Sequence, residues 1–156
     1  LLTKFGGHPM AAGLSLPTEN IDLFRAKLNR QQTLTEKELT PVTWIDVPMP
    51  VSYASKKLVE QLRVLEPFGK GNEKPVFADR KLTVRSANMI GKNKNVLKMQ
   101  LEDTQGHVVD AIQFKVEEED MPLRGKEISI VYYPDINEFR GNQTLQFIVQ
   151  EWCYTT

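Results

Sequence analysis

From residue 76 onward, apolar and polar side chains alternate, which is the period of a strand with one buried face. Five such segments occur, separated by turn-rich stretches at residues 91–95 and 103–107, around Pro122, and at 134–143. The positions assigned to the interior are Leu82 and Val84; Leu97, Met99 and Leu101; Val108, Ile112 and Phe114; Ile128, Ile130 and Tyr132; and Leu145, Phe147 and Val149. Asp110 is the exception in the third segment. Five strands with a small interruption between the third and fourth predict a five-stranded OB-fold barrel, with a small sandwich as the alternative.

The first half of the chain carries helical spacing and a linker. Asn20 precedes a helix with apolar residues at Ile21, Phe24 and Leu28, and Ser52 or Ser55 precedes a second, which ends before Pro67 and carries Leu58, Val59, Leu62 and Leu65. We also expect a flexible turn at Gly6-Gly7, a short buried strand over residues 11–16 and another over 42–47. Residues 32–41 are polar and suit a connector. The fold is therefore predicted to be mainly β with flanking α, in which a partial α/β segment (residues 1–40) precedes the barrel domain (residues 41–156).

Composition excludes several classes of protein. The chain has 156 residues, zero net charge and no apolar run long enough to cross a bilayer, so we expect a cytoplasmic protein without a membrane partner. Cys153 is the single cysteine, and His8 and His107 are the two histidines. This supply excludes an internal disulfide and makes a zinc site improbable, so no metal or cofactor is expected on this chain.

Charge is distributed unevenly along the chain. Residues 79–98 contain six basic side chains and one acidic one, whereas residues 117–120 form an acidic run. In an OB-fold the ligand lies on strands two and three and on the loops joining strands one to two and four to five. The first of those loops carries Lys92 and Lys94, and the second carries Phe139, Arg140 and Asn142. Cations for phosphates and a ring for bases are what a single-strand binder needs. The predicted phosphate contacts of the barrel are Arg85, Lys92, Lys94, Lys98 and Arg140, with Phe139 stacking on a base.

Two short strings stand out. In the segment 5–13 (Phe-Gly-Gly-His-Pro-Met-Ala-Ala-Gly), the paired glycines allow backbone amides to approach an anion, and the imidazole can donate to a phosphate. Without other information, paired glycines are more often a plain turn. In the segment 65–77 (Leu-Glu-Pro-Phe-Gly-Lys-Gly-Asn-Glu-Lys-Pro-Val-Phe), a helix stop and turn is the favoured interpretation, although Lys70 could contact DNA. Its glycine spacing fits neither a P-loop nor a dinucleotide fingerprint.

Together and in this order, the two strings resemble the RecJ single-strand-specific exonucleases of the DHH phosphoesterase superfamily. The first is similar to the Gly-Gly-His-x-x-Ala-Ala-Gly motif of the DHH-associated domain, and the second to the segment that introduces the RecJ OB domain. The resemblance implies a 5′-to-3′ exonuclease of DNA repair and recombination that uses Mn2+ or Mg2+ in an N-terminal catalytic domain. This sequence contains no Asp-His-His triplet. It implies further that Gly6, Gly7 and His8 contact DNA phosphate across the cleft from those metals.

On this basis the chain is expected to be the C-terminal part of such an enzyme, inactive alone, with single-stranded DNA and its own catalytic domain as partners and repair proteins as further candidates. An alternative is an interaction module that docks on the catalytic domain or on a repair protein, which the neutral net charge and the acidic run favour. A third interpretation is a DHH phosphoesterase acting on short oligonucleotides or cyclic dinucleotides. Such enzymes are not expected to carry the barrel.

Overall fold

The computed structural model describes residues 1–155 and divides the chain into two compact units. The first unit is Leu1–Thr43, and the second begins at Trp44 and contains the rest of the chain. The sequence placed the boundary after residue 40.

The first unit is a β-hairpin followed by two helices. Its elements are β1 (Lys4–His8), β2 (Ala11–Ser15), a 3-10 turn at Thr18–Asn20, α1 (Ile21–Gln31) and α2 (Glu36–Leu39). The predicted turn at Gly6-Gly7 is wrong, because both glycines lie within β1 and the chain reverses at residues 9–10. The predicted strand at 11–16 exists, but its residues are exposed and not buried. The polar connector contains a short helix, since Thr35 and Glu38 form a capping box that the sequence interpretation overlooked.

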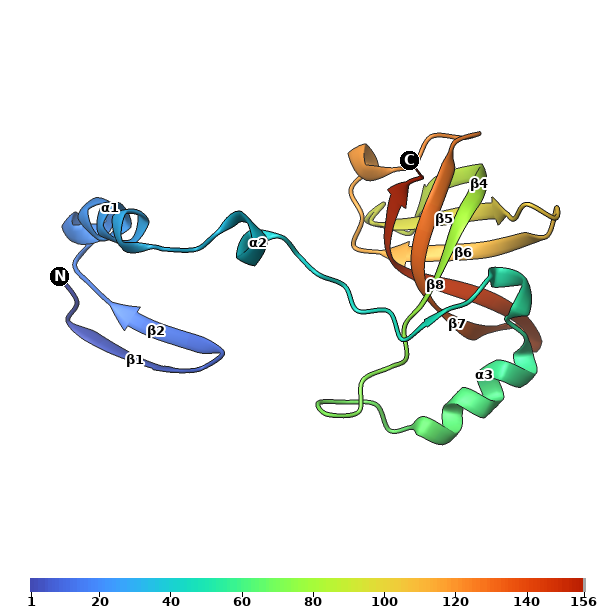
Figure 1. The fold of residues 1–156 in the computed structure, drawn as a ribbon, viewed down its shortest axis with the longest axis horizontal. Helices are drawn as coiled ribbons and strands as arrows, with labels where there is room; N and C mark the ends of the chain where they lie inside the picture. The colour runs from blue at the N-terminus through green and yellow to red at the C-terminus, as the bar shows by residue number, and fades with distance from the viewer. Residues whose placement is uncertain (156) are drawn as a thin grey trace. The chain divides into compact units, whose positions relative to one another are not determined.

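The second unit contains the predicted barrel. Its five long strands are β4 (Phe77–Ile90), β5 (Val96–Glu102), β6 (Val108–Phe114), β7 (Glu127–Phe139) and β8 (Asn142–Tyr154). They pair in the order β4-β5-β6-β8-β7, and β7 pairs back onto β4, so the sheet closes on itself (Figure 1). A 3-10 turn at Glu118–Asp120 stands between the third and fourth strands. This confirms the mainly β fold and the OB-fold order, and the closure of the sheet rules out the small sandwich.

The β7–β8 hairpin is longer than the sequence predicted. Residues 134–143 were interpreted as a loop, because Pro134 and Gly141 are turn signals. In the structure Pro134 is buried within β7 and pairs with Phe147, and only residues 140–141 turn the chain. Both turn residues have positive φ, 51° at Arg140 and 78° at Gly141, as a tight two-residue hairpin turn requires. Because β4 pairs with β7 only up to Tyr132, the end of the hairpin extends as a two-stranded ribbon.

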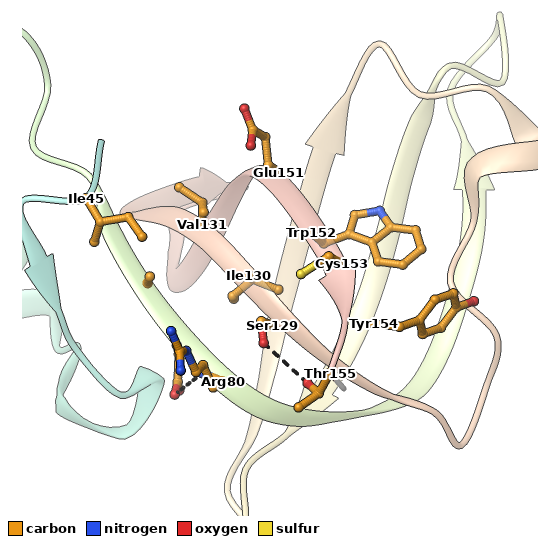
Figure 2. A pocket seen from close by; sticks show the side chains of 12 residues that line it. Ile45, Arg80, Ser129, Ile130, Val131, Glu151, Trp152, Cys153, Tyr154 and Thr155 are labelled. Atoms are coloured by element: carbon orange, nitrogen blue, oxygen red, sulfur yellow. Dashed lines mark hydrogen bonds between the residues drawn. The ribbon is translucent and has the colours of Figure 1, made fainter. Parts of the chain in front are cut away.

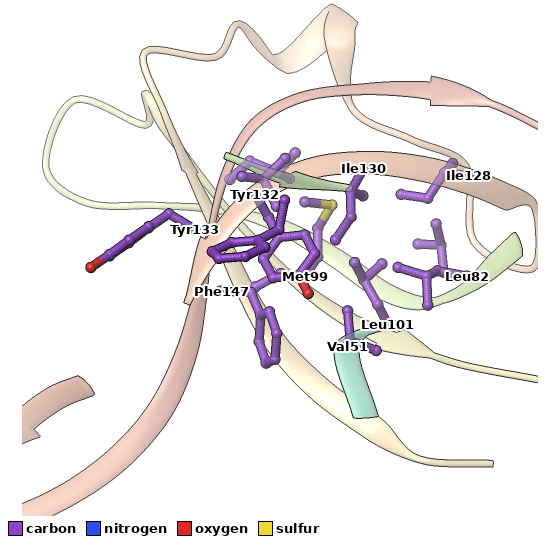
Figure 3. Packing of buried hydrophobic residues seen from close by; sticks show 14 of the residues in the cluster. Val51, Leu82, Met99, Leu101, Ile128, Ile130, Tyr132, Tyr133 and Phe147 are labelled. Carbon is purple, nitrogen blue, oxygen red and sulfur yellow. The ribbon is translucent and has the colours of Figure 1, made fainter. Parts of the chain in front are cut away.

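The core consists of the inward residues of all five strands (Figure 3). Burial is complete at the predicted interior positions of the first, second and fourth strands, such as Leu82, Leu101 and Ile130. At its centre the rings of Tyr132 and Phe147 lie 5.1 Å apart with their planes tilted by 56°. The alternation therefore predicted most of the core correctly, with the exception of β6.

The segment before the barrel packs against strands β4 and β7. It comprises β3 (Val47–Pro48), 3-10 turns at Val51–Tyr53 and Arg63–Leu65, and α3 (Lys56–Leu62). The strand predicted over 42–47 is wrong in extent, since only Val47–Pro48 pairs, in parallel, with the start of β4. Ser55 caps α3 by accepting a hydrogen bond from the Leu58 amide at 3.2 Å, which decides between the two serines considered. The helix packs beside β7 and buries Val59, the neighbour of the predicted leucine stripe.

One buried hydroxyl fastens this segment to the core. The Tyr132 Oη donates to the Met49 carbonyl at 2.8 Å. Burial, followed by the negative charge of Asp79, raises the pKa of this phenol, so it stays protonated and remains a donor. Asp79 in turn accepts a hydrogen bond from the Val51 amide at 2.8 Å. The pre-barrel segment is thus held by these two hydrogen bonds, by backbone hydrogen bonds to the start of β4 and by Val51, which is buried.

Removing the Tyr132 hydroxyl is expected to destabilise the barrel while leaving its shape intact. Tyr132→Phe leaves the Met49 carbonyl without its partner, so the free energy of unfolding should fall by about 1 kcal/mol. Chemical denaturation measures the change. Tyr53→Phe is the control, because it removes the same hydroxyl from a side chain that is 74% exposed. Equal stabilities of the two variants would contradict the role assigned to the Tyr132 hydrogen bond.

No helix within the part of the chain that the structure describes is long and apolar enough to span a membrane.

Candidate nucleic-acid interface

The β4–β5 loop (residues 91–95) presents two lysines at one end of the barrel. Gly91 has a φ of 86° and accepts a hydrogen bond through its carbonyl from the Lys94 amide at 3.2 Å, which makes the loop a tight turn. Lys94 itself has a φ of 47°. Lys92 and Lys94 are exposed, as is every residue of the loop. Their ammonium groups are therefore available to an anion.

Next to this loop, the outer face of β5 and β6 adds a cation and an aromatic ring. By register, Lys98 lies opposite Ile112, and Val96 lies opposite Phe114. Phe114 is 54% exposed, which is unusual for a phenylalanine next to a closed core. We name Lys92, Lys94 and Lys98 the basic end of this face. Phe114 lies on the face at that end and can stack on a base.

The assignment of Phe114 to the interior is a wrong prediction of which face of β6 is buried. The inward residues of β6 are Val109 and Ala111, and Ala111 is completely buried. Val108 and Phe114 are about half exposed. Counting apolar residues favoured the wrong face, because Ala111 is small while the outer face carries large side chains. Asp110 was the available signal, since a carboxylate in the supposed interior row marks the outward face.

The opposite end of the same face is acidic. Gln100 Nε2 lies 3.5 Å from Asp110 Oδ1, and Glu102 forms an ion pair with Arg85, whose Nη2 donates to Oε1 at 2.6 Å. The hydrogen bond with Glu102, and its charge, raise the pKa of the Arg85 guanidinium. Arg85 was predicted to contact phosphate. In the structure its charge is matched by a carboxylate at the acidic end.

The β5–β6 turn completes this acidic end. Asp103 accepts hydrogen bonds from the backbone amides of Gln105 and His107 at 2.8 and 2.9 Å, and its other oxygen lies 2.9 Å from His107 Nδ1. Desolvation opposes ionisation of Asp103, but these hydrogen bonds outweigh it and lower the pKa of the carboxyl. The turn is therefore held by an ionised Asp103, and His107 is a surface residue with a structural partner.

The tip of the β7–β8 hairpin lies beyond the acidic end. Since β6 and β8 run parallel with Ala111 opposite Phe147, the start of β8 lies on the side away from the β4–β5 loop. Phe139 is 64% exposed, and the Arg140 guanidinium lies over its ring at 5.1 Å. Lys56 Nζ donates to the Gln143 carbonyl at 2.6 Å and ties the tip to α3. The fold therefore brings Lys92, Lys94 and Lys98 together, and places Arg85, Phe139 and Arg140 elsewhere.

The predicted phosphate contacts of the first unit lie on the β1–β2 hairpin. Gly6 faces Gly13 across the hairpin, and His8 faces Ala11 beside the reversal. A Cβ added at Gly7 would lie 3.1 Å from the Ala11 carbonyl oxygen and the Ala12 Cβ, so glycine suits this position sterically. All these residues are exposed within their unit. Small side chains thus leave the backbone open beside the imidazole.

The second sequence string forms a locked turn. Gly69 and Asn72 exchange backbone hydrogen bonds of 2.8 and 3.0 Å, and the Asn72 side chain donates to the carbonyls of Leu65 and Pro67. Lys74 Nζ lies 4.2 Å from the centroid of the Tyr133 ring and 5.5 Å from that of Phe68. Tyr133 is consequently buried, and neither Tyr132 nor Tyr133 is free to stack on a base. The contacts of this segment are therefore those of a turn that follows a helix.

A groove of about 430 Å³ lies on another side of the barrel, over the outer surfaces of β4, β7 and β8 (Figure 2). Ile45 and Val131 give it apolar walls, and Ser129 and Thr155 hydroxyls lie 3.3 Å apart within it. Arg80 is its one lining cation. Within residues 1–155, no group of three or more His, Cys, Asp and Glu side chains could hold a metal ion.

Comparison with known proteins gives a family match for the second unit. A sequence model described as the RecJ OB domain matches residues 45–151. This chain is 37% identical to the single-stranded-DNA-specific exonuclease RecJ of Haemophilus influenzae over 96% of its length. It is 32% identical to the enzyme of the same name from Bacillus subtilis over 97% of its length. The match spans only 26% and 20% of the length of those two relatives.

The folds agree as well. A crystal structure of RecJ from Thermus thermophilus in complex with Mn2+ superposes on the whole chain with a TM-score of 0.71 at 20% identity, and the match covers 22% of that protein. A second structure of that protein, in complex with Mg2+, gives a TM-score of 0.67. At this level of identity the likeness concerns the fold.

Proposed function

This chain belongs to the RecJ OB-domain family, and from that premise we propose that its barrel binds single-stranded DNA across the basic end of the β5–β6 face. The observation that carries the proposal is the grouping of Lys92, Lys94 and Lys98 beside an exposed Phe114. Three ammonium groups supply contacts to successive phosphates, and the ring supplies a sequence-tolerant surface for one base. The acidic end repels phosphate and confines the strand to the other half of the face.

The proposed role in the whole protein follows from the relatives. The matched relatives are named as single-stranded-DNA-specific exonucleases, and this chain spans about a quarter of their length. We place the hydrolytic step, with its Mn2+ or Mg2+, in the remaining length, and the barrel delivers substrate to it. Within this chain Gly6, Gly7 and His8 are the residues proposed to contact DNA phosphate near that step. Activity in repair and recombination, with 5′-to-3′ polarity, belongs to the same proposal.

Titration of the 156-residue chain with a fluorescent dT oligonucleotide at low salt tests the proposal. We expect saturable binding that weakens with added salt, and weaker binding to a duplex, because paired bases cannot stack on Phe114. Binding of single strand and duplex with equal affinity would contradict the stacking role. No binding at low salt would favour the interaction-module alternative, for which a complex with the separately expressed remainder of the protein is the positive test.

A further inference from the structure

The structure holds four non-glycine residues at positive φ among residues 1–155, and all four are cationic. They are Lys81, Lys94, Lys115 and Arg140, with φ values of 60°, 47°, 60° and 51°. The left-handed region is unfavourable for a side chain with a Cβ, and Gly or Asn is the usual occupant. Lys and Arg fill 20 of the 156 positions, so a cation at every one of these four is not expected from random placement. The backbone conformation accounts for the turns but not for the choice of residue.

The backbones of two of these four residues lie close together. The Val116 amide donates to the Asn95 carbonyl at 3.2 Å, which joins the end of β6 to the β4–β5 loop. Lys94 and Lys115 each immediately precede one partner of that bond. The bond lies just beyond the Val96–Phe114 pair, the last one in the β5–β6 ladder, and Lys115 stands between Val116 and Phe114 in the chain. The two strained lysines therefore flank one fixed backbone contact beside the exposed ring.

Neither lysine forms an ion pair within the residues that the structure describes. Lys115 lines a hollow of about 370 Å³ together with Gln150, Asp120 and Glu151. Because those two carboxylates offset its charge, Lys115 alone does not make a positive site. Lys94, across the Val116–Asn95 bond, brings the sum of these charges to zero, and Lys92 and Lys98 of the basic end make it positive.

We propose that Lys94 and Lys115 form a clamp for a single phosphate of the DNA strand, next to the base stacked on Phe114. The proposal rests on the function proposed above and adds Lys115, which the sequence interpretation left unassigned. An unfavourable backbone conformation retained at a charged residue is a pointer to a functional side chain. Phe114 and Lys115 are adjacent in the chain, so the stacked base and the clamped phosphate belong to the same nucleotide. The clamp therefore fixes which nucleotide of the DNA strand lies at the basic end.

The test compares two substitutions that change charge and backbone in the same way. Lys115→Gly removes one charge and gives the left-handed position to glycine, and Lys81→Gly does the same at the β4 bulge, nine residues before the end of that strand. In low-salt titrations with the dT oligonucleotide, we expect Lys115→Gly to weaken binding about fivefold and to lower the salt slope by about 0.7. Lys81→Gly should bind as the unaltered chain does.

Thermal unfolding shows that the comparison is between folded proteins. Since glycine suits a left-handed position, the midpoint of Lys115→Gly should not fall below that of the unaltered chain. Should it fall, Lys115→Asn repeats the test with a side chain that also tolerates this conformation. Equal affinities of the position-115 and position-81 variants overturn the clamp while the proposed function stands. Absence of binding by the unaltered chain overturns both.

Discussion

Phe147→Ala is expected to lower the free energy of unfolding of the barrel by about 3–5 kcal/mol, the range for losing a fully buried phenylalanine ring. Phe147 is 1% exposed, and its ring packs on Tyr132 at the centre of the core. It also lies where β8 meets β6, and that pairing comprises only two residue pairs. The substitution thus opens a cavity beside the β6–β8 pairing, which has fewer residue pairs than any other pairing between the five barrel strands.

Chemical denaturation followed by tryptophan fluorescence measures the loss. Trp152 is a suitable probe because it packs against the core from β8. Phe139→Ala removes the same side chain from the same hairpin where it is 64% exposed, so its stability should stay within about 0.5 kcal/mol of the unaltered chain. A loss below about 1 kcal/mol for Phe147→Ala would mean that the core does not depend on this ring.

The alternation of side chains predicted the barrel because most strands follow one rule. Leu97, Met99 and Leu101 are large, apolar and inward, and the polar residues between them face outward. The rule failed in β6, where the inward residues are Ala111 and Val109 and the outer face holds the larger apolar residues. Packing volume inside a closed barrel, which the pattern of a single strand does not contain, decided that orientation.

The errors at turns have a different cause. Pro134 was taken to end a strand. A proline lacks only the backbone N–H, and β7 continues through Pro134, which pairs with Phe147, to Phe139. Gly6-Gly7 was taken as a turn, but the reversal follows at Pro9. Glycine and proline mark positions where the backbone can turn. Whether the chain turns there depends on its pairing with another strand.

The candidate site was predictable in its loop lysines and not in its ring. Lys92 and Lys94 occupy a turn that the sequence marks plainly, and the barrel order places that turn on the ligand side. Phe139 met the same criteria, an aromatic residue beside a cation in a loop, but the length of the β7–β8 ribbon carries it past the acidic end. The ring that lies at the basic end, Phe114, had been counted with the core.

Replacing Lys92, Lys94 and Lys98 together with alanine should lower the affinity for single-stranded DNA at low salt by roughly one to two orders of magnitude. Each phosphate contact contributes about 0.7 to the slope of log affinity against log salt for a single strand, so the slope should flatten by about 2. A fourfold rise in salt would then cost the unaltered chain roughly 20-fold more affinity than the variant. Fluorescence anisotropy over a range of salt concentrations measures both quantities.

A control with the same total charge separates local from overall electrostatics. Lys57, Lys81 and Lys126 of the second unit are exposed and lie outside β5, β6 and the loop between β4 and β5, and replacing them with alanine also takes the net charge from zero to minus three. Because a neutral chain attracts DNA only through a local concentration of cations, this control should keep most of the affinity and the full salt slope. Equal losses in the two triple variants would assign the binding to overall charge, and an unchanged affinity in the first would remove the basic end from the DNA path.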